Sequence, residues 1–330
     1  MNHTFRTLKW KRHSTAIARK RLRRQRRKKG QTLFNSPKYF KKISAPAYFS
    51  MIKNPEGMVR FYHDFENVVS TGAGVDFDLS QIKVMTVDAV LYTLYFFDYL
   101  KSKRVYYFVR GNEPKDQECK RIFQESGFYK YVQSSQLNKT SYNIFPIESG
   151  TSVDPTLAEK IIDFTRDRLL YPKSKKIEGV FITLVECMTN TIQWAYEKNY
   201  SLNKWWVAAY YDKNQNKIFY IFLDNGQGIP STVSKRFPER VAAIFKKITK
   251  QQLDTTLIKS ALKGEFRTRT KQSSRGKGLP QIYSFAKEGK ISDLRIMSNR
   301  GYIDTVDPNN CEELSRKFIG TLFSWSYSTK

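Results

Sequence analysis

Residues 184–197 read LVECMTNTIQWAYE. Apolar side chains recur here at helical spacing, which predicts a helix over residues 178–199 with one face in the core. Glu186 and Asn190 are four residues apart, so they lie one turn apart on the same side of that helix. A carboxylate and an amide beside a core face need polar partners, which makes this helix the first candidate for a binding site.

The composition is that of a folded, strongly basic protein. The 330 residues include 58 Lys and Arg against 30 Asp and Glu, a net charge of +28, and 40% of them are apolar. Three cysteines stand far apart without a CxxC pair, and the three histidines all lie near the N-terminus. This usage argues against a disulfide framework, a zinc site or a histidine-based centre, and it predicts a cytoplasmic protein.

No stretch reaches the roughly 20 apolar residues that a membrane-spanning helix needs. The nearest, residues 89–100, is shorter and contains Asp98. The N-terminus also lacks the apolar centre of a signal peptide. We therefore expect no membrane span.

The positive charge is concentrated in a basic arm, residues 1–53, which contains 17 Lys and Arg and no acidic residue. Such density favours a polyanion, DNA or RNA, bound with a strong dependence on salt. A solvated tail, an anionic-lipid patch or a targeting tract remain alternatives. The candidate nucleic-acid contacts are Arg19, Lys20, Arg21, Arg23, Arg24, Arg26, Arg27, Lys28 and Lys29.

Two folded parts follow the arm. Residues 54–145 alternate strand (75–80), helix (86–101), strand (105–112) and helix (114–128, closed by Gly127), which predicts a small α/β domain. A polar link, 133–143, leads to a boundary near residue 145. Residues 146–330 predict helices at 155–170, 178–199 and 279–288, strands at 205–212, 217–225, 294–299 and 320–327, and an irregular stretch over 231–275. The predicted class is mixed α/β (α+β), with an α/β sandwich in the C-terminal part.

Two glycine-rich turns accompany the helix of Glu186 and Asn190. In DNGQGIP (224–230), Gly226 and Gly228 allow a tight turn after Asp224. In SSRGKGLPQI (273–282), Gly276 and Gly278 precede a helix, where free backbone N–H groups can hold phosphates. Each motif is weak alone, but their order along the chain is more specific.

In that order, the chain from about 155 to 327 resembles the ATP-binding domain of the GHKL superfamily, which includes gyrase B, histidine kinases and the anti-sigma-factor serine kinases. ECMTN (186–190) matches the N box, DNGQG (224–228) the G1 box, GKGL (276–279) the G2 box and GTLF (320–323) the last strand. The anti-sigma kinases are the most similar group, although a histidine common among them is Trp194 here. The resemblance implies a Bergerat fold that binds ATP and Mg²⁺.

The resemblance also implies a role for each matching residue. Asn190 would coordinate Mg²⁺, and Glu186 would serve as the general base. Asp224 would accept a hydrogen bond from the adenine amino group, with Thr321 assisting through a water. Gly226 and Gly228 would shape the wall over the base. The phosphates would meet Gly276, Lys277, Gly278 and Leu279. Pro280 stands where many relatives have glycine, in a helical first turn that accepts proline.

In this family the stretch 231–275 is the ATP lid. It carries twelve Lys and Arg against three acidic residues. Arg267, Arg269 and Arg275 are candidates for contacts with the γ-phosphate. A basic surface that extends the polyanion footprint of the arm is the alternative.

The segment 76–94, DFDLSQIKVMTVDAVLYTL, is similar to the STAS fold of anti-anti-sigma factors. Those proteins accept phosphate on a serine ahead of a helix, and Asp88 stands near that position here. An aspartate would mimic the charged state and could not itself be switched.

Three functions are consistent with these patterns. The preferred one is a Mg-ATP-dependent ATPase whose nucleotide state controls binding to nucleic acid, a protein partner or a second copy, with prokaryotic defence or mobile-element biology a guess from architecture. The second is a serine/threonine kinase of the partner-switching type. The third is a binding module that uses ATP without hydrolysing it.

Overall fold

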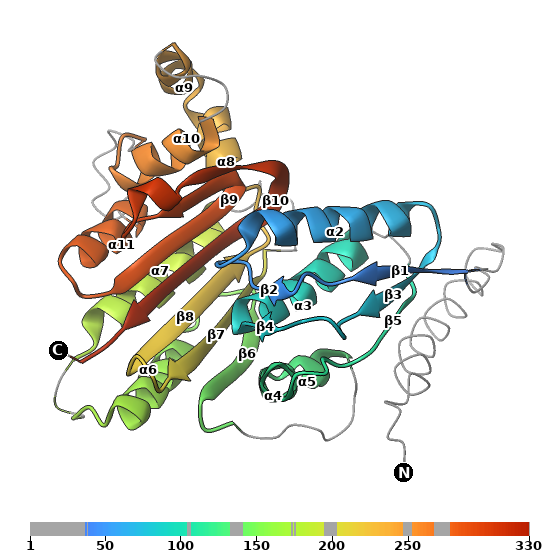
Figure 1. Cartoon of the computed structure of the whole chain (residues 1–330). Helices are drawn as coiled ribbons and strands as arrows, with labels where there is room; N and C mark the ends of the chain where they lie inside the picture. The colour runs from blue at the N-terminus through green and yellow to red at the C-terminus, as the bar shows by residue number, and fades with distance from the viewer. Residues whose placement is uncertain are drawn as a thin grey trace, which may run out of the picture. The chain divides into compact units, whose positions relative to one another are not determined.

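The computed structural model describes residues 37, 39–103, 107–132, 141–172, 174, 176–194, 203–246, 253–266 and 278–329. Helices and strands alternate in both halves of the chain (Figure 1), which confirms the mixed α/β class. The chain divides into two compact units between Thr140 and Ser141. This division lies a few residues before the boundary that we expected near residue 145.

The first unit is built on parallel strands. Its three-stranded sheet has the order β1-β3-β5, and β2 pairs with β4. The strands are β1 (Phe40–Ser44), β2 (Tyr48–Phe49), β3 (Gly74–Asp78), β4 (Val84–Met85) and β5 (Val109–Gly111). The helices are α2 (Pro55–Ser70), α3 (Val87–Ser102), α4 (Gln117–Glu125) and α5 (Phe128–Val132). Gly127 has a φ of +84°, as a residue that ends a helix in the left-handed region should.

Residues 40–53 differ from the sequence analysis, which assigned them to the basic arm. They form β1 and β2, and the side chains of Ile43, Phe49 and Met51 are buried. Two short apolar alternations hidden among lysines were too weak a strand pattern to separate this segment from the arm. The rest of the predicted arm, residues 1–36, lies outside the described residues.

Asp88, near the N-terminus of α3, is buried and holds the loop after β2. Its carboxylate accepts a hydrogen bond of 2.6 Å from the Met51 N–H, and the Ser50 hydroxyl lies 3.5 Å away. Burial raises the pKa of this carboxyl above its ordinary value. Since Asp88 is only 3% exposed, it serves the packing of this unit and does not present a charge to a partner at the surface.

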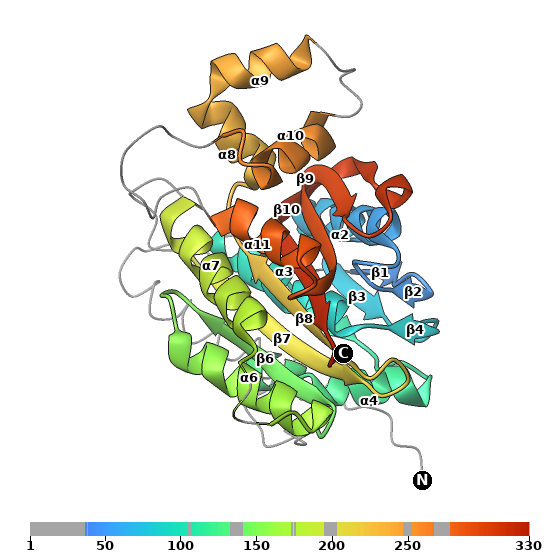
Figure 2. The same ribbon diagram turned by 90° about the vertical axis from the view of Figure 1, so that its left-hand side faces the viewer.

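The second unit contains one five-stranded antiparallel sheet of order β6-β7-β8-β10-β9. The strands are β6 (Ile144–Gly150), β7 (Trp205–Asp212), β8 (Lys217–Asp224), β9 (Ser292–Asp304) and β10 (Glu312–Tyr327). Helices α6 (Pro155–Leu169), α7 (Glu178–Trp194) and α11 (Gly278–Lys287) lie on one face of it (Figure 2). Their apolar sides and the facing residues of the strands, among them Phe222 and Trp325, form one core.

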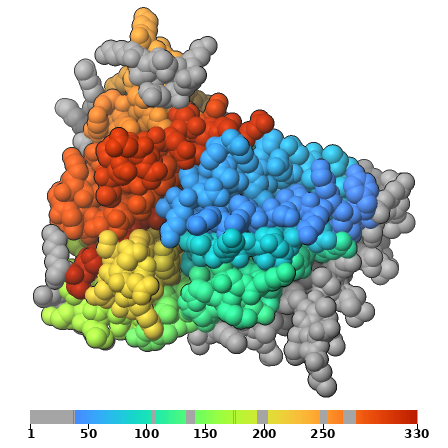
Figure 3. All heavy atoms as spheres, in the orientation of Figure 1, coloured from blue at the N-terminus to red at the C-terminus, as the bar shows by residue number. Residues whose placement is uncertain are grey.

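The irregular stretch expected over 231–275 is wrong where the structure describes it. Three helices occupy it: α8 (Ile229–Arg236), α9 (Pro238–Phe245) and α10 (Leu253–Leu262). They form because they share a small core of their own, made by Val233, Val241, Leu257, Ala261 and Phe266. α10 also packs against β9 and β10. In the space-filling view the orange part of the chain lies directly against the red C-terminal part (Figure 3).

A strand was missed at the sheet edge. β6 begins just after the expected link and spans the domain boundary that we expected near residue 145, and its pairing with β7 is interrupted between Phe145 and Glu148. Pro146 interrupts the pattern of a strand, which explains why the sequence did not predict it. Among the described residues, no helix is long and apolar enough to cross a membrane, as expected.

We predict that Asp88→Ala lowers the free energy of unfolding by about 2 kcal/mol, because the Met51 N–H would lose its buried acceptor. Urea denaturation measures this. Asp64→Ala, which removes an exposed carboxylate from α2, is the control and should change stability by less than about 0.5 kcal/mol. Equal effects of the two substitutions would contradict the role assigned to Asp88.

Candidate functional site

Glu186 and Asn190 lie on α7 and meet at the first residue of α11. A Cβ atom built on Gly278 would lie 2.7 Å from Glu186 Oε2 and 3.0 Å from Asn190 Nδ2. A larger residue here would push the Glu186 carboxylate and the Asn190 amide aside, so glycine lets the two polar groups approach the start of α11 closely. Two segments almost ninety residues apart in sequence are thus brought into direct contact.

The start of α11 brings backbone donors to this pair. The first N–H groups of a helix have no partner within it, and the helix dipole adds a partial positive charge there. Leu279 follows Gly278 and packs against the core, which fixes the first turn. Gly276 and Lys277, the other residues predicted to meet phosphates, lie outside the described residues, as do Arg267, Arg269 and Arg275.

Asn190 carries an unsatisfied polar atom. Its Nδ2 is buried and has no hydrogen-bond partner in the part of the chain that the structure describes. Buried amide groups without a partner are rare, because losing water without a replacement costs about 1–3 kcal/mol. Glu186 is half-buried, and desolvation raises the pKa of its carboxyl above its ordinary value. A buried donor without a partner and a desolvated carboxyl are both groups that a polar ligand would stabilise.

Asp224 ends β8 and is the second centre of the site. It is 8% exposed and accepts a hydrogen bond of 2.7 Å from the Gly226 N–H, together with bonds from the backbone and hydroxyl of Thr321. The strand register places Thr321 directly opposite Asp224 on β10. Burial outweighs these donors and raises the pKa of Asp224 to about 7.

Gly228 is required at its position for two reasons. Its φ of +88° lies in the left-handed region, and an added Cβ would lie 2.1 Å from Asn299 Oδ1. The next residue, Ile229, begins α8. Gly228 therefore turns the chain from β8 into α8 while the middle of β9 passes close by.

The two centres are neighbours. Cys187, next to Glu186 on α7, is buried, and the charges of Asp224 and Glu186 both help to raise the pKa of its thiol. The structure thus brings together two groups of predicted residues. One consists of Glu186, Asn190, Gly278 and Leu279, and the other of Asp224, Gly226, Gly228 and Thr321, with Cys187 within electrostatic reach of both.

Sequence reasoning missed Ser298 and Asn299 in the middle of β9. Ser298 Oγ accepts a hydrogen bond of 2.8 Å from the Ile229 N–H and lies 3.1 Å from Thr321 Oγ1. Asn299 contacts the Ser231 hydroxyl at 2.8 Å. Serine and asparagine at the end of an apolar strand pattern carry no distinctive signal, so only the pairing of β9 with β10 reveals them.

The side chains available as ligands limit the kind of magnesium site that this protein could form. No group of three or more His, Cys, Asp or Glu side chains suited to a metal occurs in the described part of the chain. The unsatisfied atom of Asn190 is its amide nitrogen, a donor that suits an acceptor such as a phosphate oxygen, whereas its amide oxygen is the atom that could coordinate a Mg²⁺ ion taking its other ligands from phosphates and water.

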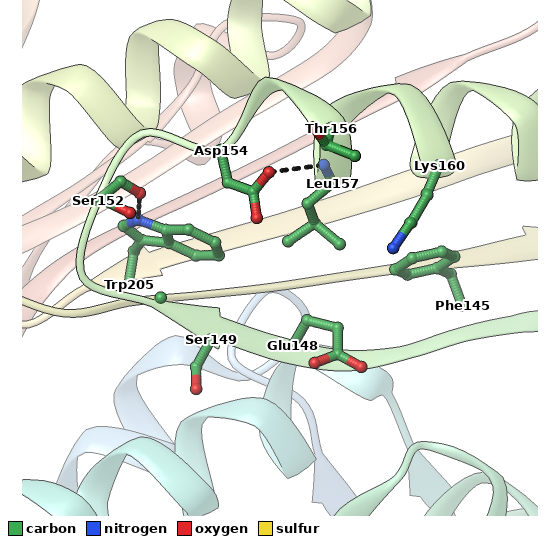
Figure 4. A pocket seen from close by; sticks show the side chains of 10 residues that line it. Phe145, Glu148, Ser149, Ser152, Asp154, Thr156, Leu157, Lys160 and Trp205 are labelled. Atoms are coloured by element: carbon green, nitrogen blue, oxygen red, sulfur yellow. Dashed lines mark hydrogen bonds between the residues drawn. The ribbon is translucent and has the colours of Figure 1, made fainter.

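A separate cavity of about 310 Å³ lies between β6 and α6 (Figure 4). Its polar groups are partly paired already, since Asp154 accepts from the Leu157 N–H and the Trp205 indole donates to the Ser152 carbonyl. None of the predicted site residues lines it. Its wall and the Asp224 site nevertheless share a strand pair, because Trp205 is the partner of Asp224 on β7.

Comparison of the sequence with protein-family models and with curated proteins finds no match.

We predict that the unfolding free energies of the wild type and Asp224→Asn diverge with pH. The folded protein holds the Asp224 proton up to about pH 7, whereas the unfolded chain releases it near 3.8. The wild type should therefore lose stability relative to Asp224→Asn as pH rises from 4 to 7, by up to about 4 kcal/mol. Denaturation curves at several pH values measure this. The difference should be constant above pH 8, and parallel curves from pH 4 to 8 would contradict the assignment.

Proposed function

We propose that residues 141–330 bind Mg-ATP in the manner of the GHKL superfamily and hydrolyse it. The observation that carries this proposal is the convergence of Glu186, Asn190 and the first turn of α11 at Gly278, close to the buried carboxylate of Asp224. Carboxylate, amide and helix N-terminus together suit a metal-bound phosphate chain, and a buried carboxylate suits a base with an amino group.

Base recognition would fall to Asp224 and Thr321. An ionised carboxylate accepts hydrogen bonds only, so Asp224 can take one from the amino group of adenine and none from the carbonyl of guanine. Thr321 and Gly226 already hold this carboxylate in place. Gly226 and Gly228 keep side chains away from the space beside it.

Phosphate binding would fall to Asn190 and α11. The amide oxygen of Asn190 would bind Mg²⁺, and the N–H groups of Gly278 and Leu279 would approach phosphate oxygens. Gly276 and Lys277 would complete the G2 box. Asn190 Nδ2, which has no hydrogen-bond partner among the described residues, supports an acceptor such as a phosphate oxygen here.

Glu186 is the candidate general base. Its carboxylate would take a proton from the water that attacks the terminal phosphorus, while the bond to the ADP oxygen breaks. The raised pKa of Glu186 makes it a stronger base than an exposed glutamate. The same geometry serves a serine or threonine hydroxyl as nucleophile, which is the kinase alternative.

We predict that Asn190→Ala abolishes magnesium-dependent ATP binding, whereas Glu186→Gln keeps binding within about threefold and lowers turnover at least 100-fold. Asn190 would hold the metal, and Glu186 would act only on the proton. Isothermal titration calorimetry and release of labelled phosphate measure the two effects. Ser326→Ala, a buried hydroxyl at the other end of β10 that donates to Asp293, is the matched control for both.

The destination of the label separates the alternatives. Free phosphate supports an ATPase, and label on protein supports a kinase. Binding without release in the wild type would leave an ATP-dependent binding module. Wild-type protein that fails to bind Mg-ATP at millimolar concentration would refute the proposed function.

We also propose that the basic arm binds DNA or RNA and that nucleotide state controls this or another partner, including a second copy, in the cytoplasm. The support is the charge of the arm, since its nine candidate residues between Arg19 and Lys29 lie outside the described residues. Phosphate contacts by these side chains would release counterions.

Deletion of residues 1–30 should weaken binding to a DNA or RNA duplex at least tenfold at low salt and flatten its salt dependence. Fluorescence anisotropy measures the affinity. Binding that is unchanged by the deletion would contradict a nucleic-acid role for the arm.

A further inference from the structure

We infer that Ser298 is a positioning residue that links the start of helix α8 to the carboxylate of Asp224 through the hydroxyl of Thr321. This inference rests on the proposed function only where it assigns adenine to Asp224. The link itself follows from the contacts that join Ile229, Ser298, Thr321 and Asp224.

The three residues lie side by side on neighbouring strands. Thr321 is paired with Asp224 on β8 and with Ser298 on β9. Their side chains are buried, with 0% exposure for Ser298 and 3% for Thr321. Water is thus excluded from the contacts between them, and each polar atom depends on its protein partners.

Counting donors and acceptors gives this row a direction. The strand register sets Thr321 opposite Asp224, and an ionised Asp224 accepts only, so in our inference the Thr321 hydroxyl gives its single proton to the carboxylate. The Thr321 oxygen is then an acceptor for Ser298 at 3.1 Å. Ser298 in turn accepts the Ile229 N–H at 2.8 Å. The row therefore runs from the Ile229 N–H through Ser298 and Thr321 to Asp224, and each bond strengthens the next.

The first bond in the row is also the cap of α8. Gly228 precedes the helix and offers no side chain, and no side-chain cap forms within this segment. Ser298 supplies the missing acceptor from β9. If the start of α8 moves, Ser298 loses that donor and can turn to the Gly320 carbonyl, which lies 3.4 Å away. Thr321 would then no longer accept a hydrogen bond from Ser298, and that bond is what orients the Thr321 hydroxyl proton toward Asp224.

Because of this link, base binding at Asp224 and the position of α8 should depend on each other. α8 opens the segment that carries the basic residues Lys235 and Arg236. Occupation of the base site would thereby stabilise the start of that segment, and displacement of α8 would weaken base binding.

The test follows the titration of the Asp224 carboxyl by ¹³C NMR in the protein without nucleotide, with the signal assigned by Asp224→Asn. Among the described residues, the titratable group that interacts with Asp224 is Cys187 on α7, which Glu186 on the same helix also affects, and both are unchanged in every variant. We expect Ser298→Ala to raise the midpoint by about one pH unit, a tenfold change in proton affinity. Ser298→Thr should restore the wild-type midpoint, and Ser326→Ala should not move it.

Thr321→Val tests the route. It should raise the midpoint by itself, and adding Ser298→Ala should then have no further effect, because Ser298 acts through the Thr321 hydroxyl. Additive shifts, or a midpoint that does not respond to Ser298→Ala, would overturn the inference. If Ser298→Ala does not fold, Ser298→Cys, a weaker donor, should give an intermediate midpoint, and a wild-type midpoint in that variant would be equally decisive.

Two further measurements separate this inference from the proposed function. The Ile229 amide should exchange at least tenfold faster in Ser298→Ala than in Ser298→Thr. Adenosine, which has no group that titrates near neutral pH, should bind Ser298→Ala severalfold more weakly at pH 7. If wild-type protein binds no adenosine, the proposed function fails, while the NMR titration and the amide exchange still decide the role of Ser298.

Discussion

The burial of the Asp224 carboxylate is the constraint on which the second unit depends. A carboxyl group in the interior is costly unless donors surround it, and here the donors come from Gly226 and from Thr321 on the adjacent strand. Those donors are present only if β10 pairs with β8 in this register, and Thr321 reaches Ser298 only if β9 is the next strand. One polar requirement therefore selects the strand order at the centre of the sheet, and the apolar core on the helical face supplies the free energy for it.

The sequence predicts those elements whose pattern is long and regular. α3, α6, α7 and the hairpin of β7 and β8 lie within a few residues of their expected bounds, because each has many apolar positions in a single period. β1, β2 and β6 were missed because lysines or a proline interrupt short runs. The helices over 229–262 were missed for another reason. The described part of their core has five buried members, shared among segments whose individual patterns are weak.

The relative position of Glu186 and Asn190 was predictable, because both belong to one motif and their spacing places them on one face of one helix. The meeting of that pair with Gly278 and the row through Ser298 could not be derived from spacing, because both depend on tertiary packing between segments distant in sequence. Asp88 provides the opposite lesson. A residue proposed as a charged mimic near a helix start proves to be an internal acceptor for the loop after β2, a role that sequence does not distinguish from exposure.

β6 has a consequence for association between molecules. It pairs with the outer side of β7, whose sequence is WWVAAYYD. If the backbone N–H and C=O groups on that side were unpaired, this apolar strand could pair with a strand of another molecule. β6 is itself poorly suited to accept a further strand, since Pro146 lacks an N–H and the irregular pairing after Phe145 bends its path. A chain shortened to begin at residue 151 would lose this shield and expose the apolar β7 edge, so the first seven residues of the sheet protect the protein from aggregation.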